Sequence, residues 1–142
     1  MALTFSVLVT DNISGSGLQP LREDSQFELV EINDSSSTDF RNALPSADGL
    51  IVRSATKVDS DMLAEAQSLK VIGRAGVGVD NIDLDAATER GIAVLNAPAG
   101  NTVSAAELTL ALMLSVVRRV PGADASVRRG EWDRGRFKGA EL

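Results

Sequence analysis

Residues 70–83 read KVIGRAGVGVDNID, which has the form of a strand, a turn and the start of a helix. A short apolar run ends on Arg74 and passes through a glycine-rich bend into acidic residues. Gly76 and Gly78 predict a sharp turn that leaves backbone N–H groups uncovered. Arg74 adds a fixed positive charge beside those donors. The combination favours a small anion, either a carboxylate or a phosphate.

Short apolar, β-branched runs of the same kind recur through the first 100 residues. They are Phe5–Thr10, Phe27–Ile32, Gly49–Val52, Val71–Gly73 and Ile92–Leu95. Segments with helical spacing of apolar residues separate them, which predicts repeated β–α units and a parallel sheet. The runs are mostly continuous rather than alternating in polarity, as is typical of strands covered on both faces. We therefore expect a flavodoxin-like α/β domain with the strand order 2-1-3-4-5.

The helix boundaries carry their own signals. Asp59 and Asp83 are predicted N-caps, and the helix after Asp83 is expected to end at Arg90 with Gly91 just beyond it. After residue 100 the pattern changes to one long helix over Ser104–Val120, followed beyond Pro121-Gly122 by a second helical piece, Ala123–Arg129. The long helix is apolar nearly all round, and such a helix is normally buried on more than one side. We expect one domain over 1–100 and the opening of a second over 101–142.

The composition excludes several classes of chemistry. The 142 residues include no cysteine and no histidine, so thiolate chemistry, the commonest general base and the usual zinc ligands are missing. No metal site is expected. A net charge of −6 disfavours nucleic acid as a partner. The N-terminus lacks a basic signal-peptide region, and the apolar run Leu108–Val117 is too short to cross a bilayer. We expect a cytoplasmic protein with no membrane partner.

The predicted sheet brings two arginines together. Ligands of open parallel sheets bind beyond the carboxyl ends of the strands. Arg53 follows the third strand and Arg74 ends the fourth, and these strands are neighbours in the expected order. Two guanidinium groups beside glycine amides would suit a small molecule with two anionic groups. The alternative is that each arginine pairs with a local acid, for which Asp11, Asp48 and Asp80 are available.

The polar residues after the glycine turn have simpler interpretations. The spacing from Gly76 to Asn81 is close to the dinucleotide fingerprint, but Asn81 stands at its third glycine position, so we do not expect a cofactor-phosphate cradle. Asp80, Asn81 and Asp83 are predicted to cap the next helix and to brace the turn. Asn101, at the start of the long helix, could cap that helix or contact a ligand.

Several motifs in register give the chain a family resemblance. They occupy residues 50–58, 71–83, 91–98, 101–109 and 130–132. Together they resemble the D-isomer-specific 2-hydroxyacid dehydrogenases, from about residue 5 to the last residue. Within that family, the arginine at position 74 favours the branch that acts on phosphoglycerate over relatives that act on glycerate or lactate.

The resemblance implies a set of substrate-binding residues. They are Arg53, Ser54, Arg74, Gly76, Val77 and Asn101. The arginines would contact a phosphorylated substrate, and the amides around Gly76 and Val77 would meet its carboxylate. Val77 and Asn101 would also lie near the cofactor, NAD. Position 77 is often threonine in relatives, so valine here removes a hydroxyl contact to the cofactor.

The resemblance also implies what this chain lacks. The long helix would cross from the substrate domain into a truncated Rossmann domain, with the dinucleotide fingerprint and the catalytic arginine, acid and histidine beyond Leu142. We therefore expect the chain to bind a small, 3-phosphoglycerate-like anion without catalysis, NAD to be held mainly by the absent domain, and the protein to be a homo-oligomer. The alternative is a freestanding anion-binding module that self-associates through Leu108–Val117.

Overall fold

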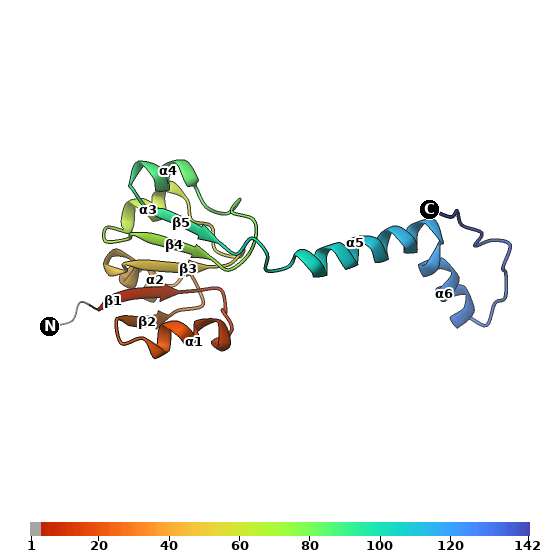
Figure 1. Cartoon of the computed structure of the whole chain (residues 1–142), viewed down its shortest axis with the longest axis horizontal. Coiled ribbons are helices and arrows are strands. Elements are labelled where there is room, and N and C mark those ends of the chain that lie inside the picture. The colour runs from red at the N-terminus through yellow and green to blue at the C-terminus, as the bar shows by residue number, and fades with distance from the viewer. Residues whose placement is uncertain (1–3) are drawn as a thin grey trace. The chain divides into compact units, whose positions relative to one another are not determined.

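The computed structural model describes residues 4–142 and divides into two compact units. The first ends at Gly100 and the second runs from Asn101 to Leu142 (Figure 1). Among the described residues, no helix combines the length and the hydropathy needed to span a lipid bilayer.

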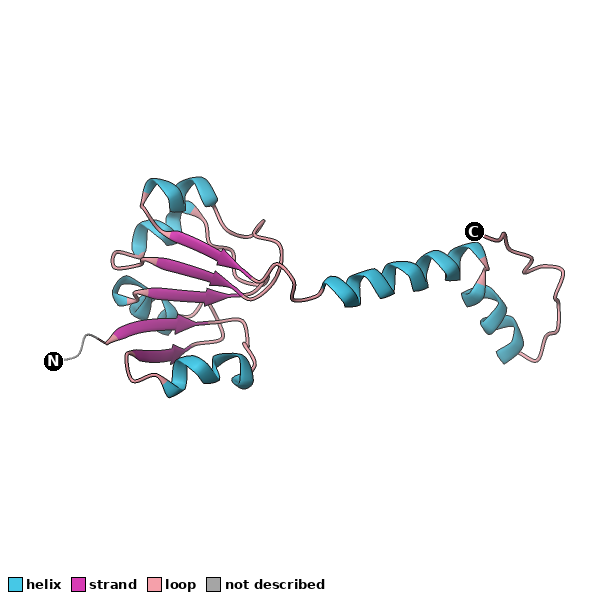
Figure 2. Cartoon of the chain, in the orientation of Figure 1, coloured by secondary structure: helices cyan, strands magenta, loops and turns pink. Residues whose placement is uncertain are grey.

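The first unit is built on one five-stranded sheet in which every neighbouring pair of strands is parallel. Its strands are β1 (Phe5–Val9), β2 (Phe27–Glu31), β3 (Gly49–Val52), β4 (Val71–Arg74) and β5 (Ala93–Asn96). The order across the sheet is β2-β1-β3-β4-β5, which confirms the predicted order. Because all strands run the same way, their carboxyl ends meet at one edge (Figure 2).

Helices connect the strands, and two of them, α3 and α4, begin at the N-caps that the sequence predicts. They are α1 (Gly15–Glu23), α2 (Thr38–Ala43), the 3₁₀ turn η1 (Leu44–Ser46), α3 (Ser60–Glu65) and α4 (Leu84–Glu89). The Asp59 carboxylate accepts the N–H of Met62 at the start of α3, and Asp83 accepts that of Ala86 at the start of α4. Gly91 has a φ of 68°, as a glycine just past a helix end often does. Both cap predictions are confirmed.

The sheet has a core on each face. The larger core packs side chains of β1, β3 and β4 against α2, η1, α3 and α4; its fully buried members include Leu8, Leu50, Ile72, Phe40 and Leu63. The smaller core packs β1 against α1. Each of these burials stabilises the fold by about 1.5–3 kcal/mol. The result is a rigid base for the loops at the carboxyl edge.

The second unit contains α5 (Thr102–Val117) and α6 (Val120–Arg128). The long helix ends three residues before the predicted boundary, because Arg119 adopts a left-handed φ of 54°. Pro121 then lies in the first turn of α6, where a proline loses no helical hydrogen bond. The prediction that Pro121 and Gly122 separate the two helices was therefore wrong: they belong to the second one.

The tail of the second unit returns to the end of α5. The Ala140 N–H donates to the Val117 carbonyl at 3.0 Å. A Cβ atom at Gly139 would lie 2.1 Å from that oxygen, so only glycine permits this approach.

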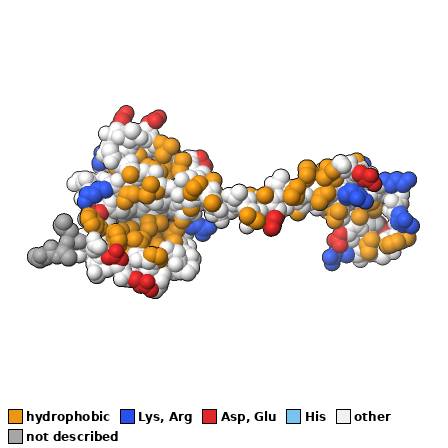
Figure 3. Space-filling view, viewed as in Figure 1, with side chains coloured by type: hydrophobic (Ala, Val, Ile, Leu, Met, Phe, Trp, Pro, Cys, Tyr) orange, Lys and Arg blue, Asp and Glu red, His pale blue; other side chains and the backbone are white. Residues whose placement is uncertain are grey.

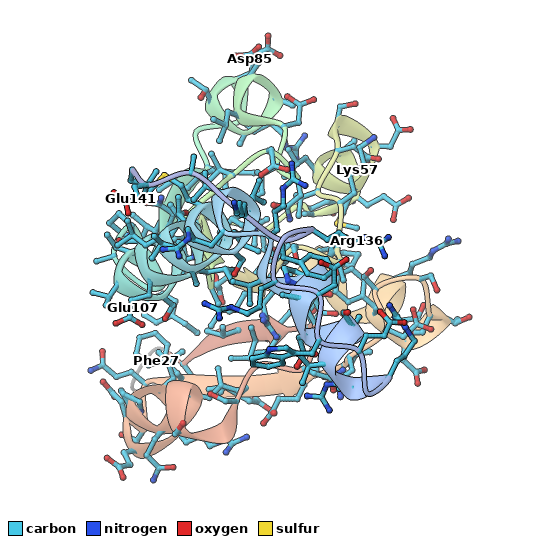
Figure 4. All side chains as sticks on the ribbon, turned by 90° about the vertical axis from the view of Figure 1, so that its right-hand side faces the viewer. Phe27, Lys57, Asp85, Glu107, Arg136 and Glu141 are labelled. Atoms are coloured by element: carbon cyan, nitrogen blue, oxygen red, sulfur yellow. The ribbon has the colours of Figure 1, made fainter. Side chains whose placement is uncertain are left out.

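Helix α5 itself buries none of its residues within the second unit. Hydrophobic side chains are exposed along its length (Figure 3), and Glu107, labelled in Figure 4, is its only charged residue. The burial expected for so apolar a helix is therefore not provided by α6 or the tail.

Candidate functional site

The two arginines lie at the ends of adjacent strands. In the register of β3 and β4, Val52 stands opposite Arg74, so Arg53 is the next residue beyond the pair. This placement at neighbouring strand ends was predicted from the sequence and is confirmed by the register.

Neither arginine forms an ion pair with any carboxylate in residues 4–142. Asp48 is paired instead with Lys70, at 2.6 Å, and Asp11 accepts hydrogen bonds from backbone. The alternative of local acid partners for the arginines was therefore wrong. Moreover, Arg74 Nε is buried and has no hydrogen-bond acceptor within the described residues. An unsatisfied buried donor costs about 1–3 kcal/mol, so an anion that reached this atom would recover that energy.

In the glycine-rich turn after β4, one backbone N–H that was predicted to be uncovered is hydrogen-bonded. The Gly76 N–H donates to the Arg74 carbonyl at 2.8 Å, which closes a three-residue turn around Ala75. This N–H is therefore not uncovered, and neither Gly76 nor Gly78 adopts a positive φ. The lack of a side chain at position 76 bears on Arg74 instead, because a Cβ there would lie 1.8 Å from Arg74 Nη1 and the guanidinium group would have to move. The guanidinium group of Arg74 rests directly against the backbone of the turn.

Two other amides of the turn remain available. The N–H groups of Val77 and Gly78 donate to no acceptor in residues 4–142. The carbonyls beside them are held from β5: Ala97 N–H donates to Gly76 at 2.9 Å, and Asn96 Nδ2 donates to Val77 at 2.7 Å. Because these carbonyls are fixed, the free N–H groups next to them keep a fixed direction, as an anion cradle requires.

The loop after β3 is held by a carboxylate from β1's end. One oxygen of Asp11 accepts the N–H of Arg53 at 2.8 Å and that of Thr56 at 3.0 Å, and the other accepts the Thr56 hydroxyl at 2.6 Å. Burial by itself would raise the pKa of Asp11. The hydrogen bonds from Thr56 and Arg53, together with the Arg53 charge, outweigh burial and hold that pKa below its usual value. Asp11 is therefore ionised at neutral pH.

Asn81 holds the same loop from the opposite side. Its Nδ2 donates to the carbonyls of Arg53 and Thr56, each at 2.7 Å. Asp83 caps α4, so the prediction that Asn81 helps to cap that helix was wrong. The reason is topological, since only the folded sheet brings the loops after β3 and β4 together. Asp11 and Asn81 thus hold the loop of the candidate site, whereas the sequence predicted an ion-pair partner at Asp11 and a helix cap at Asn81.

The remaining predicted residues are placed as follows. Ser54 is exposed in the loop after β3, next to Arg53, and the Val77 side chain is also exposed. Asn101 begins the second unit as the N-cap of α5, and its side chain makes no capping hydrogen bond. Arg53 also lines a hollow of about 420 Å³, together with Ala75 and residues of the β1–α1 connection. Among residues 4–142, no three acidic side chains are grouped to hold a metal ion.

Comparison with known sequences gives one consistent result. Residues 7–136 match the D-isomer specific 2-hydroxyacid dehydrogenase family, catalytic domain. D-3-phosphoglycerate dehydrogenase of Bacillus subtilis is 50% identical over 138 residues, and that of Methanocaldococcus jannaschii is 50% identical over 136. These alignments cover 97% and 96% of this chain but only 26% of each relative. The chain thus spans about a quarter of the length of these relatives.

Solved structures agree with the sequences. D-lactate dehydrogenase from Aquifex aeolicus, complexed with NAD and lactic acid, matches with a TM-score of 0.83 and 27% identity over 95% of this chain and 41% of that one. NAD⁺-bound 3-phosphoglycerate dehydrogenase of Entamoeba histolytica matches with a TM-score of 0.68 and 30% identity over 81% and 40%. With its parallel sheet, its motifs and these matches, the chain belongs to the D-isomer specific 2-hydroxyacid dehydrogenase family.

Proposed function

We propose that this chain binds the anionic substrate of an NAD-dependent D-3-phosphoglycerate dehydrogenase and contributes no catalytic residue of its own. One observation carries the proposal: Arg53 and Arg74 end adjacent strands, and neither has a carboxylate partner within residues 4–142. Two such cations beside free backbone donors form a binding site for a ligand with two negative groups.

The roles divide by chemistry. Arg53 and Arg74 pair with the phosphate, for which the forked guanidinium group is well suited. The free N–H groups at Val77 and Gly78 receive the carboxylate, and Ser54 offers a hydroxyl beside Arg53. Gly76 serves by its lack of a side chain, because it leaves room for Arg74. The role of Asn101 at the substrate and the cofactor stays a prediction.

The reaction is proposed for the longer protein. Its substrate would be 3-phosphoglycerate and its product 3-phosphohydroxypyruvate, in the first step of serine biosynthesis. NAD would accept the hydride, and we place its binding site mainly in sequence that the relatives carry beyond the matched quarter. The turn described here does not fit a dinucleotide, because Arg74 occupies the space against Gly76 and Asn81 is engaged with the loop after β3.

Isothermal titration with two matched ligands tests this proposal. D-3-phosphoglycerate and D-glycerate share the carboxylate and differ in the phosphate. We expect the phosphorylated ligand to bind at least about tenfold more tightly, because charge-assisted hydrogen bonds contribute about 1.5–3 kcal/mol each. Equal affinities, or no binding of D-3-phosphoglycerate, would contradict the proposal. NADH formation from 3-phosphoglycerate by the purified chain would contradict the absence of catalytic residues.

The exposed helix supports a second candidate function, self-association. Val116 is 74% exposed and Leu108 is 59% exposed, and an apolar surface of this extent favours a protein partner. Sedimentation at micromolar concentration should then show a dimer or larger species, and the double substitution Leu108→Lys with Leu112→Lys should convert it to monomer. Glu107→Lys on the same helix is the control for added charge. A monomeric wild-type chain excludes this function.

A further inference from the structure

Asp11 connects two loops that lie far apart in the sequence. It follows β1, whereas the loop that it holds follows β3, 42 to 45 residues later. Three hydrogen bonds converge on its two oxygens, from both backbone and side chain. All three donors belong to Arg53 or Thr56, so the carboxylate spans the stretch from which the side chains of Arg53 and Ser54 project.

The backbone conformation of the turn after β1 directs the Asp11 carboxylate toward the loop after β3. Asp11 and Asn12 both adopt left-handed backbone conformations, with φ of 63° and 51°. Aspartate and asparagine are among the few non-glycine residues that accept this region. The side chain of Asn33, after β2, receives the Asn12 N–H at 3.2 Å and so supports the turn. A strained turn that places a carboxylate under a loop is typical of functional positions.

The exposed part of the loop after β3 has few contacts besides those to Asp11 and Asn81. Thr56 is 1% exposed and forms its anchor, whereas Arg53, Ser54 and Ala55 are exposed and belong to no helix or strand. Asn81 holds carbonyls of the loop, and Asp11 holds its N–H groups. Without Asp11, the Arg53 N–H would lose its acceptor. The backbone position from which the Arg53 side chain extends would then no longer be fixed.

We propose that Asp11 is a positioning residue of the anion site, which fixes the backbone of Arg53 and thereby presets the arginine for the ligand. The inference rests on the proposed function, since it concerns affinity for the same anion. Asp11 does not touch the ligand. It holds the backbone of Arg53 in place before binding, and so lowers the conformational entropy that the loop loses when the ligand binds.

Asp48 provides a matched control. It is also an aspartate beside the sheet, it also accepts a backbone N–H across strands (Ser6, 3.0 Å), and its pKa is also lowered, by hydrogen bonds from Lys70 and Ser6. It precedes β3, at the amino edge of the sheet. A variant there removes comparable interactions without touching the anion site.

The test measures the affinity for D-3-phosphoglycerate of the 142-residue chain and its variants. Asp11→Gly removes the carboxylate, and glycine accepts the left-handed turn without strain. We expect its affinity to fall about tenfold, the effect of ordering one loop side chain on binding. Asp11→Asn keeps an acceptor and the same backbone preference, and should stay within about threefold of wild type. Asp48→Gly, which removes a carboxylate at the amino edge in the same way, should leave affinity unchanged.

A second pair keeps the inference falsifiable if Asp11→Gly does not fold. Thr56→Val removes one donor to Asp11 and should weaken binding, whereas Thr56→Ser keeps the hydroxyl and should restore it. Wild-type affinity in Asp11→Gly, or an equal loss in Asp48→Gly, overturns the positioning role. Failure of the wild-type chain to bind D-3-phosphoglycerate is a different result, which overturns the proposed function itself.

Discussion

The two edges of the sheet differ in whether their positively charged side chains have carboxylate partners. At the amino edge, the Lys70 ammonium is paired with Asp48 at 2.6 Å and lies 5.3 Å from the centre of the Phe5 ring. At the carboxyl edge, Arg53 and Arg74 have no carboxylate partner within residues 4–142. The Asp11 carboxylate, whose pKa the Arg53 charge helps to lower, accepts the backbone N–H groups of Arg53 and Thr56 and forms no ion pair with either guanidinium group.

If the proposed function holds, this difference separates charges that stabilise the fold from charges that bind the ligand. A cation whose partner lies within the same fold contributes to stability and offers little to a ligand. A cation that the fold leaves without a carboxylate partner, beside N–H groups that are also unpaired within the protein, can pair with a bound anion in place of water. The carboxyl edge is also where the connections of an open parallel sheet leave room for a ligand. Each substitution below tests one edge against the other.

The largest effect is expected from the double substitution Arg53→Gln with Arg74→Gln. Loss of two charge-assisted contacts, each worth about 1.5–3 kcal/mol, should weaken the binding of D-3-phosphoglycerate by about a hundredfold or more. Lys70→Gln removes a cation at the amino edge and should leave affinity unchanged. Isothermal titration measures both. Wild-type affinity in the double variant would show that the arginines are not ligand contacts.

Gly76→Ala should have the next largest effect. Its Cβ would meet Arg74 Nη1 at 1.8 Å, so the guanidinium group must move from the turn. We expect affinity to fall about tenfold, as displacement of one charged contact predicts, with the fold retained. Gly73→Ala is the matched control, because its Cβ would make only ordinary contact, 3.8 Å from Ile51. Equal affinities of the two variants would refute the steric role of Gly76.

At the amino edge, Asp48→Asn should affect stability and not binding. It weakens the contacts to Lys70 and to the Ser6 N–H, and we expect the free energy of unfolding to fall by about 1 kcal/mol. Urea denaturation measures this change. A loss of affinity for D-3-phosphoglycerate in a folded Asp48→Asn variant would contradict the separation of the two edges.

The smallest effect concerns pH. The folded state lowers the pKa of Asp48, through hydrogen bonds from Lys70 and Ser6, and that of Asp11. A lowered pKa contributes stability that is complete above the ordinary aspartate pKa of about 4 and is lost as pH falls through the folded value. The stability difference between wild type and Asp48→Asn should therefore shrink below about pH 4. A difference that stays constant, or grows, would contradict this assignment.

Local signals predicted most of the fold. The caps at Asp59 and Asp83 and the glycine after α4 follow from residues within a few positions of each other. The strand order followed from the repeated β–α pattern over the whole of residues 1–100. The adjacency of Arg53 and Arg74 followed from strand order alone. By contrast, the end of α5 depends on a left-handed Arg119, a residue with no special preference for that conformation.

The parts of the site that were mispredicted depend on distant contacts. Asp11 and Asn81 reach across 25 to 45 residues to one loop, and no local pattern contains that information. The Gly76 N–H was expected to be free, yet the turn itself supplies its acceptor. The signal that could have found Asp11 is its position, an acid directly beyond the central strand β1, next in the sheet to β3.

Residue-resolved NMR titration of the chain with D-3-phosphoglycerate reports on both edges of the sheet in one experiment. Binding at the carboxyl edge should give saturable shifts of the Val77 and Gly78 amides and of the Arg53 and Arg74 Nε–H signals, with the Ser6 and Lys70 amides unchanged. Shifts centred on Ser6 and Lys70, or no saturable shift at Arg53 and Arg74, would contradict it.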